Sequence, residues 1–230
     1  MNKLLADSIY FGMTVSIIGY GIGLLIQKKL KNGLFNPLLI SIIFVIAVIK
    51  IFDIQYQTYD ETAKYLSYLL TPATVALAIP LYQKISLLKE NPLAVGLSIV
   101  AGVFSSMGSV FLLSWMFQLS HEQYVSLLPK SITTAIGMGI SEELGGIVAI
   151  SVAAITITGI LGNVIAEVVC KIFRITEPIA KGLAIGTASH AAGTSKALEI
   201  GEVEGAMSSL SIAVSGLLTV VFASVFATLL

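Results

Sequence analysis

The sequence predicts an all-α integral membrane protein: a multi-pass helical bundle with broken or re-entrant helices, arranged as inverted repeats as in secondary transporters. Of its 230 residues, 56% are hydrophobic and 11% are charged, and the mean hydropathy is +0.95. A soluble chain carries about 25% charged residues, and a chain this short cannot bury so much apolar surface in one aqueous core. The apolar stretches are also interrupted by polar segments in three places.

Five stretches are apolar and long enough to cross a bilayer as helices, which takes about 20 residues. They are residues 4–27, 34–52, 93–117, 147–169 and 206–230. The first is too long for a signal peptide and has no small-residue cleavage site, so we expect a retained helix. We expect residues 1–230 to form a single membrane domain in the lipid bilayer.

Three segments between these spans are too apolar for loops and too interrupted for lipid-facing helices. They are residues 66–82, with TPATVALAIP, residues 124–146, with LPKSITTAIGMGISEELGG, and residues 179–205, with GTASHAAGTSKALEIGEVEG. Irregular backbone survives at membrane depth only where protein buries it or where it lines a wet cavity. These segments are therefore the candidates for a functional site.

Loop charges orient the spans through the positive-inside rule. The basic loops, expected in the cytoplasm, hold Lys28, Lys29, Lys31, Lys84, Lys89, Lys171, Arg174 and Lys181. Residues 53–61 and 120–122 hold no Lys or Arg and are expected outside. An odd number of crossings must separate the outer turn at His121 from the inner loop at Lys171. We therefore expect one of the two segments between them, residues 124–146, to be re-entrant.

This scheme places the N-terminus outside and the C-terminus inside, and it makes residues 179–205 cross toward an outer end at Glu199, Glu202 and Glu204. It also suggests a repeat. Residues 66–117 and 179–230 each pair a broken segment with a span containing Leu-Ser-Ile, and they would run in opposite directions. Such an inverted repeat is the ground plan of many secondary transporters. The alternative is chance similarity among apolar helices.

The first broken segment contains two prolines, Pro72 and Pro80. Each removes a backbone donor and obstructs a helix, and the hydroxyls of Thr71 and Thr74 are positioned to bond the freed carbonyls. We include Thr71, Pro72 and Thr74 in the candidate binding site. The alternative is a proline kink without a function.

The second broken segment places an ammonium and three hydroxyls at the start of an expected half-helix: Lys130, Ser131, Thr133 and Thr134. A helix N-terminus favours a bound anion, and Lys130 would share a helix face with Thr134. The sequence therefore predicts an anion site here. The alternative is that Lys130 extends to the membrane interface.

The third broken segment places Thr187, His190 and Thr194 on one expected helical face, with Ser189 beside them. An ionisable residue at membrane depth indicates a functional site, and His190 titrates near neutrality. It is a candidate to carry a proton or to bind a carboxylate. The alternative is a neutral histidine with a hydrogen bond inside the bundle.

Other polar and small residues receive structural interpretations. We expect Lys196 and Glu199 to form a local pair, Glu167 to reach the inner interface, and Glu202 to lie at the N-terminus of the last helix. Close-packing helix faces are expected at two sets of small residues. These sets are Gly19 with Gly23, and Ser105 with Gly108 and Ser109.

Several functional classes receive no support from the sequence. It contains no Walker motif, no dinucleotide-binding glycine motif, no H-E-x-x-H and no Cys/His metal spacing. The formal net charge of zero gives no indication of nucleic-acid binding. We therefore expect no enzyme activity, no cofactor and no metal. A passive or proton-coupled path for a small organic anion is favoured.

Four runs in this chain resemble the LrgB/CidB family. They are NPLL (36–39), LLTPATVALAIPLY (69–82), LPKSITT (128–134) and SHAAGTSKALEIGEVEGAMSSL (189–210), and the resemblance covers nearly the whole chain. The family motif has Ala or Arg near the positions of Ser195 and Lys196. The resemblance implies a multi-pass protein of the bacterial inner (plasma) membrane, with an LrgA/CidA-type small membrane protein as partner. We also expect a homo-oligomer.

The resemblance supports two hypotheses about function. Family members are described as antiholin-like, a plastid relative moves glycolate and glycerate, and bacterial members are linked to pyruvate. The first hypothesis is a transporter of small monocarboxylates such as glycolate, glycerate or pyruvate, linked to control of autolysis. The alternative is an antiholin-like regulatory subunit that modulates murein hydrolase export.

Overall fold

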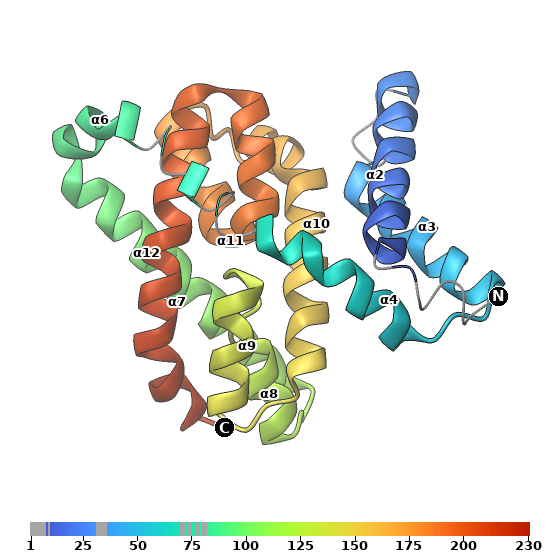
Figure 1. Cartoon of the computed structure of the whole chain (residues 1–230). Helices are drawn as coiled ribbons and strands as arrows, with labels where there is room; N and C mark the ends of the chain where they lie inside the picture. Colours follow the sequence, from blue (N-terminus) through green and yellow to red (C-terminus); the bar gives the residue numbers. More distant parts are fainter. Residues whose placement is uncertain are drawn as a thin grey trace. The chain divides into compact units, whose positions relative to one another are not determined.

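The computed structural model describes residues 8, 10–30, 36–69, 72, 75–76, 79 and 82–230, and every regular element in this part of the chain is helical (Figure 1). The predicted all-α membrane class is confirmed. By its internal contacts the chain divides into two compact units, Met1–Ala76 and Leu77–Leu230. The expectation of a single membrane domain stays a prediction.

The first unit is built on α2, against which α3 and α4 pack. Its elements are α2 (Phe11–Leu30), α3 (Pro37–Ile51), α4 (Tyr56–Ala63) and the 3-10 helix η1 (Lys64–Leu69). Asn36 caps α3 by accepting two backbone N–H groups. α3 lies directly against Gly19 and Gly23 of α2. A Cβ on Gly19 would meet the side chains of Phe44 and Ser41, and a Cβ on Gly23 would meet the backbone of Pro37. The predicted close packing at these glycines is confirmed.

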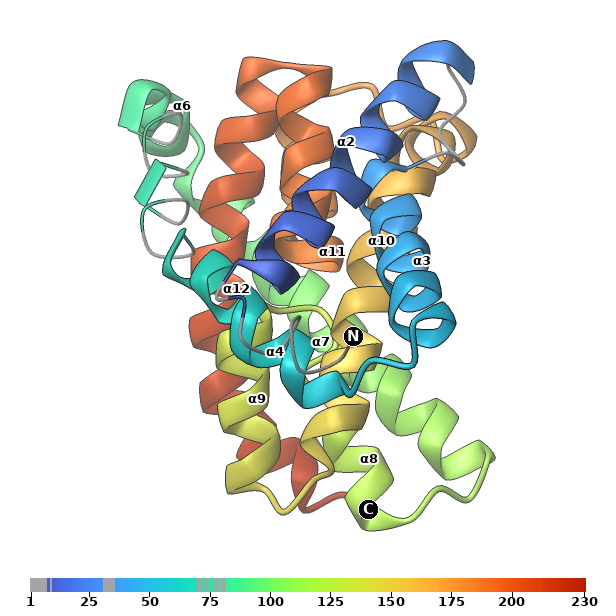
Figure 2. The same ribbon diagram turned by 45° about the vertical axis from the view of Figure 1, so that its right-hand side comes forward.

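The second unit holds the rest of the described helices (Figures 1 and 2). They are α6 (Ile85–Glu90), α7 (Pro92–Met116), α8 (His121–Leu127), α9 (Thr134–Glu143), α10 (Val148–Ile172), α11 (Pro178–Ile200) and α12 (Glu202–Ala227). The apolar core lies among α7, α8, α9, α11 and α12, around the fully buried Tyr124 and Met207.

Four helices among the described residues are long and apolar enough to cross a membrane: α2, α7, α10 and α12. They correspond to four of the five predicted spans. The other predicted span, residues 34–52, contains α3, which has 15 residues. At 1.5 Å per residue α3 is about 22 Å long, shorter than the roughly 30 Å hydrocarbon core of a bilayer.

The helices α8 and α9 form a re-entrant hairpin, as predicted for residues 124–146. The backbone N–H of Ile147, after α9, donates to Ser126 Oγ in α8 at 2.7 Å, so the chain leaves beside the place where it entered. The turn between the helices lies beside the middle of α7, where Ser131 Oγ is 2.9 Å from Ser106 Oγ. The hairpin therefore enters the bundle and returns to the same end.

A second hairpin is formed by α11, which the sequence analysis expected to cross the membrane. His190 has φ 43° and ψ −138°, and this conformation breaks the helix. Gly193 lies against Ile185, with the ideal Cβ position 3.1 Å from the Ile185 carbonyl oxygen. In a straight helix these two residues would stand about 12 Å apart along the axis. The two arms of α11 therefore fold back on each other, and the predicted crossing is wrong.

Contacts at both ends of α12 establish its direction. Glu202, at its start, pairs with Lys84 (Nζ to Oε2, 3.0 Å), whereas the Phe226 carbonyl near its end accepts from the Tyr124 hydroxyl of α8 at 2.7 Å. In both views the start of α12 lies with α6, and the C-terminus lies with α8 (Figures 1 and 2). The acidic residues 199–204 therefore lie at the end that carries Lys84, and the C-terminus lies at the other. Both were predicted the other way round.

We call the end of the second unit that carries Lys84, Lys171 and Lys181 the basic end. The α8–α9 hairpin enters from the opposite end, where α7 finishes and α10 begins, and the α11 hairpin enters from the basic end. The inverted repeat in the form predicted from sequence is not seen, because residues 179–205 do not cross. Instead, the second unit contains two hairpins that enter the helical bundle from opposite ends.

Candidate functional site

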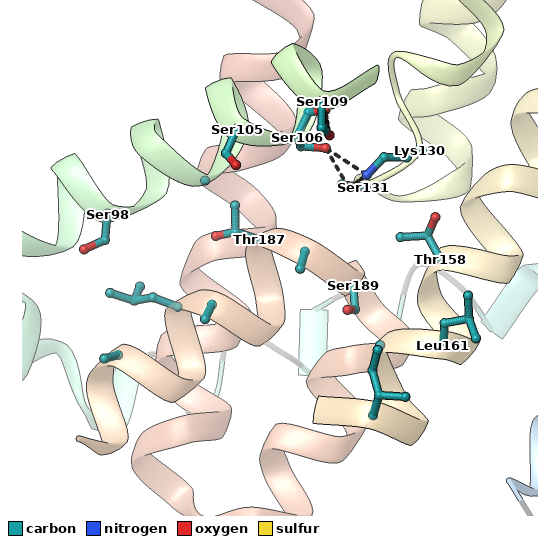
Figure 3. A pocket seen from close by; sticks show the side chains of 17 residues that line it. Ser98, Ser105, Ser106, Ser109, Lys130, Ser131, Thr158, Leu161, Thr187 and Ser189 are labelled. Carbon is teal, nitrogen blue, oxygen red and sulfur yellow. Dashed lines mark hydrogen bonds between the residues drawn. The ribbon is translucent and has the colours of Figure 1, made fainter. Parts of the chain in front are cut away.

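The tips of the two hairpins meet at a pocket of about 730 Å³ (Figure 3). Its walls come from α7, from the turn before α9, from α10 and from the first arm of α11. The polar side chains that line it are Ser98, Ser105, Ser106, Ser109, Lys130, Ser131, Thr158, Thr187 and Ser189. Carboxylates are absent from this lining. The pocket thus offers hydroxyl groups and one ammonium.

Lys130 is the charged residue of this lining. Its Nζ donates to Ser106 Oγ at 3.2 Å and to Ser131 Oγ at 3.1 Å, and Figure 3 shows these bonds at the hairpin turn. Within the described part of the chain Lys130 forms no salt bridge. Because an ionisable side chain at membrane depth is costly unless an opposite charge balances it, the arrangement favours an anion in the pocket. Lys130 faces the pocket, as the anion-site hypothesis requires.

The local geometry around Lys130 differs from the prediction in one respect. The expected half-helix starting at Pro129 does not form; α9 begins at Thr134, with Thr133 as its N-cap, and Lys130 lies in the turn before it. Lys130 and Thr134 therefore do not share a helix face. Ser131 lines the pocket, whereas Thr133 and Thr134 do not.

Thr187 and Ser189 bring the first arm of α11 into the site. The Thr187 side chain is 5% exposed, and its Oγ1 has no hydrogen-bond partner among the described residues. Its methyl group lies against Gly102 of α7, where a Cβ would collide with it. An unpaired buried hydroxyl on a pocket wall is a candidate for a bond to a solute.

His190 and Thr194 lie behind the pocket and hold the tip of α11 in place. His190 Nε2 is 3.0 Å from the carbonyl oxygen of Ile155 in α10. Thr194 Oγ1 donates to the His190 carbonyl at 2.9 Å and lies 2.7 Å from Ser208 Oγ in α12. Neither residue lines the pocket, and the break at His190 means that Thr187 and Thr194 do not share one helical face.

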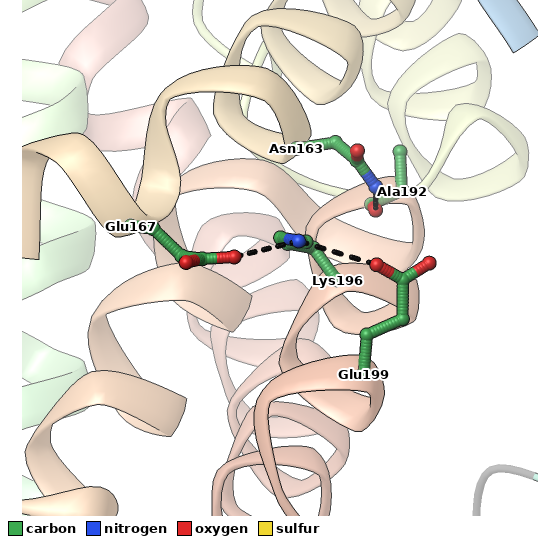
Figure 4. A network of polar contacts seen from close by, with 5 residues as sticks. All are labelled: Asn163, Glu167, Ala192, Lys196 and Glu199. Carbon is green, nitrogen blue, oxygen red and sulfur yellow. Dashed lines mark hydrogen bonds and ion pairs between the residues drawn. The ribbon is translucent and has the colours of Figure 1, made fainter. Parts of the chain in front are cut away.

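The second arm of α11 is fastened to α10 (Figure 4). Lys196 Nζ lies 2.6 Å from Glu167 Oε1 and 3.2 Å from Glu199 Oε2, and Asn163 Nδ2 donates to the Ala192 carbonyl at 2.7 Å. The predicted local pair of Lys196 and Glu199 is confirmed. Glu167, expected to reach the interface alone, joins the same group.

The first broken segment is only partly described. Thr71, Thr74 and Pro80 lie outside the described residues, and Pro72 is helical and belongs to the first unit. A role for Thr71, Pro72 and Thr74 in the site stays a prediction.

The serine face of α7 is absent from the predicted site. Its members recur at helical spacing: Ser98, Ser105, Ser106 and Ser109. The sequence predicts close packing for Ser105 and Ser109, together with Gly108. Ser105 and Ser109 line the pocket, and no described atom lies within 4 Å of a Cβ built on Gly108. The helical recurrence of serine on an otherwise apolar span was the signal available.

Comparison with known proteins identifies the family. Residues 16–229 match the LrgB-like family. Two proteins named "Antiholin-like protein LrgB", from Bacillus cereus (strain B4264) and Bacillus anthracis (strain CDC 684 / NRRL 3495), are each 40% identical over 218 residues, covering 94% of this chain and 95% of the relative. No solved structure matches significantly. The chain belongs to the LrgB-like family of membrane proteins.

Proposed function

We propose that this chain is a transporter of small monocarboxylates in the bacterial inner membrane, and that it is not an enzyme. The observation that carries the proposal is the Lys130 ammonium, between two hairpins that enter from opposite ends. Its hydrogen-bond partners in the described part of the chain are both serines. Backbone breaks at membrane depth are typical of solute sites in secondary transporters. The positive-inside rule puts the basic end in the cytoplasm.

The chemistry of the lining favours a small, singly charged anion. One ammonium can neutralise one carboxylate, and the surrounding hydroxyls can bond further oxygens of the solute. Proton coupling is not part of this proposal, because the His190 ring lies against the Ile155 carbonyl and lines none of the described pockets.

Uptake into proteoliposomes tests the proposal directly. Purified protein should accumulate labelled pyruvate or glycolate faster than protein-free vesicles, and an excess of unlabelled monocarboxylate should compete. A small cation of similar size serves as the control solute. Equal uptake with and without the protein for both acids would refute the transport proposal.

We predict that Thr187→Val raises the KM for uptake. Losing one hydrogen bond to a solute costs about 1 kcal/mol, so KM should rise about fivefold. The thermal midpoint in detergent should stay the same or rise, because the substitution removes an unpaired buried hydroxyl. Ser114→Ala is the matched control, because Ser114 Oγ is also buried without a described partner but lines none of the described pockets. An unchanged KM in Thr187→Val would remove Thr187 from the site.

A second candidate function is antiholin-like regulation with an LrgA/CidA-type membrane protein as partner. The names of the relatives that are 40% identical favour it, and favour it more directly than they favour transport. It predicts that Lys130→Ala preserves control of lysis in cells that contain the partner. Bulky changes at Gly19 or Gly23 do not test a partner surface, because both glycines pack inside the first unit. If Lys130→Ala abolishes both uptake and lysis control, the regulatory role depends on the pocket.

A further inference from the structure

A second pocket lies between the main pocket and the basic end. It measures about 280 Å³ and shares Ser98, Ala180 and Leu183 with the main pocket. Its lining reaches Asn91 and Glu177, which immediately precede α7 and α11 at the basic end. The two pockets therefore follow one another along α7, from the basic end to the region of Lys130.

The opposite end is closed by packed side chains. Beyond the hairpin turn, Leu128 and Ile132 are 1% and 2% exposed, and Tyr124 is fully buried with its ring edge-on to Phe111 at 6.2 Å between centroids. Between the hairpin turn, α7 and α12 the described residues leave a void of about 10 Å³, lined in part by Leu128, Ile132 and Thr219. A volume of that size holds at most about one water molecule, so an organic anion does not pass through this void.

The two hairpins are attached to α12 in different ways. The second arm of the α11 hairpin is bonded to α12 through Thr194 and Ser208, and both arms pack along α12. The hydrogen bond between the α8–α9 hairpin and α12 in the described part of the chain is the one from the Tyr124 hydroxyl to the Phe226 carbonyl. This carbonyl also accepts from the Leu229 N–H at 3.0 Å, so it remains paired when Tyr124 moves away.

We propose that the α8–α9 hairpin is the gate opposite the basic end, and that the bond from Tyr124 to Phe226 is its latch. The structure stands open at the basic end and closed at the gate. Opening would separate the turn of the hairpin from α12 and expose Lys130 and Thr219 to the other side of the membrane. This inference rests on the proposed transport function, since a gate requires a solute path.

Thiol labelling in sealed vesicles tests the gate without any transport measurement. The background is Cys170→Ser, because Cys170 is the only cysteine. In that background, a membrane-impermeant methanethiosulfonate reagent should label Ser98→Cys from the basic side. Thr219→Cys should react slowly from the opposite side, and adding Tyr124→Phe should raise that rate about fivefold, as expected for loss of one hydrogen bond worth about 1 kcal/mol.

Tyr20→Phe is the matched control, because Tyr20 is an exposed tyrosine of α2. It should leave the labelling rate of Thr219→Cys unchanged. A Ser98→Cys that resists the reagent from the basic side would overturn the open route. An equal rate of Thr219→Cys labelling with tyrosine or phenylalanine at position 124 would overturn the latch.

A cross-link provides a second test if Tyr124→Phe does not fold. Leu128→Cys and Thr219→Cys line the same small void, so a short thiol cross-linker joining them should hold the gate shut. Uptake should then fall by at least tenfold and recover when a cleavable linker is reduced. Full uptake by the cross-linked protein would overturn the gate. If labelling follows the expected pattern but uptake of both acids is absent, the gate stands and the proposed solute is wrong.

Discussion

Replacing Lys130 with alanine should lower monocarboxylate uptake by about tenfold to a hundredfold without destabilising the protein. A charge-assisted hydrogen bond contributes about 1.5–3 kcal/mol, and Lys130 supplies the only charge in the pocket lining. Its partners are the hydroxyls of Ser106 and Ser131, which also bond each other at 2.9 Å and so remain paired without it. Uptake assays and thermal midpoints in detergent measure the two effects separately.

The stability result distinguishes a functional charge from a structural one. A half-buried ammonium that forms no salt bridge within the described part of the chain carries a desolvation cost, so its removal should leave the midpoint unchanged or raise it. A lysine that held the hairpin in place would instead lower the midpoint when replaced. Lys89→Ala, at an exposed lysine of α6, is the matched control and should change neither quantity. Normal uptake by Lys130→Ala would remove the anion site from the proposal.

Re-entry of the α8–α9 hairpin could be predicted because charged loops lie on both sides of it. The basic loop at Lys171 and the loop at 120–122, which has no Lys or Arg, set the number of crossings between them, and only one full apolar span was available. Loop charges could not predict the hairpin of α11. After Lys181 the only Lys or Arg is Lys196, which is paired with Glu167 and Glu199, so no loop charge orients α12.

The turn of α11 depends on a conformation that the sequence does not reveal. His190 adopts a positive φ, which is uncommon for a residue other than glycine, and contacts from α10 and α12 hold it there. From spacing alone, Thr187, His190 and Thr194 fit one continuous helix. The spacing identified polar residues that lie at or near the site, but it predicted the wrong backbone conformation. The bond that stabilises the turn comes from Ile155, which is 35 residues away in the sequence.

The role of the serines on α7 could not be predicted, for a related reason. A serine on a membrane helix is small enough for close packing and polar enough to line a pocket, and the choice depends on what lies opposite. Ser105 and Ser109 face an open pocket, whereas Gly23 faces the backbone of α3. Residue type alone predicts close packing at both faces. The difference between them depends on whether a neighbouring helix lies opposite.

Replacing Gly186 with valine should cause the largest loss of stability among the substitutions considered. Gly186 lies in the first arm of α11, where a Cβ would meet the Ser208 carbonyl and the Ser211 hydroxyl of α12. Both α11 and α12 would have to move apart. Overpacking of this kind costs about 1–3 kcal/mol, which predicts a fall of about 5 °C in the thermal midpoint.

The control for this substitution is Gly108→Val in α7, where a Cβ meets no described atom within 4 Å. Both substitutions place a β-branched residue in a long helix, so the difference between their midpoints isolates the contact between α11 and α12. Gly186→Val should also lower uptake, because Gly186 directly precedes Thr187 and its displacement moves the pocket wall. Equal midpoints for the two variants would mean that α11 does not pack on α12 as a hairpin. A straight, membrane-crossing α11 would then have to be reconsidered.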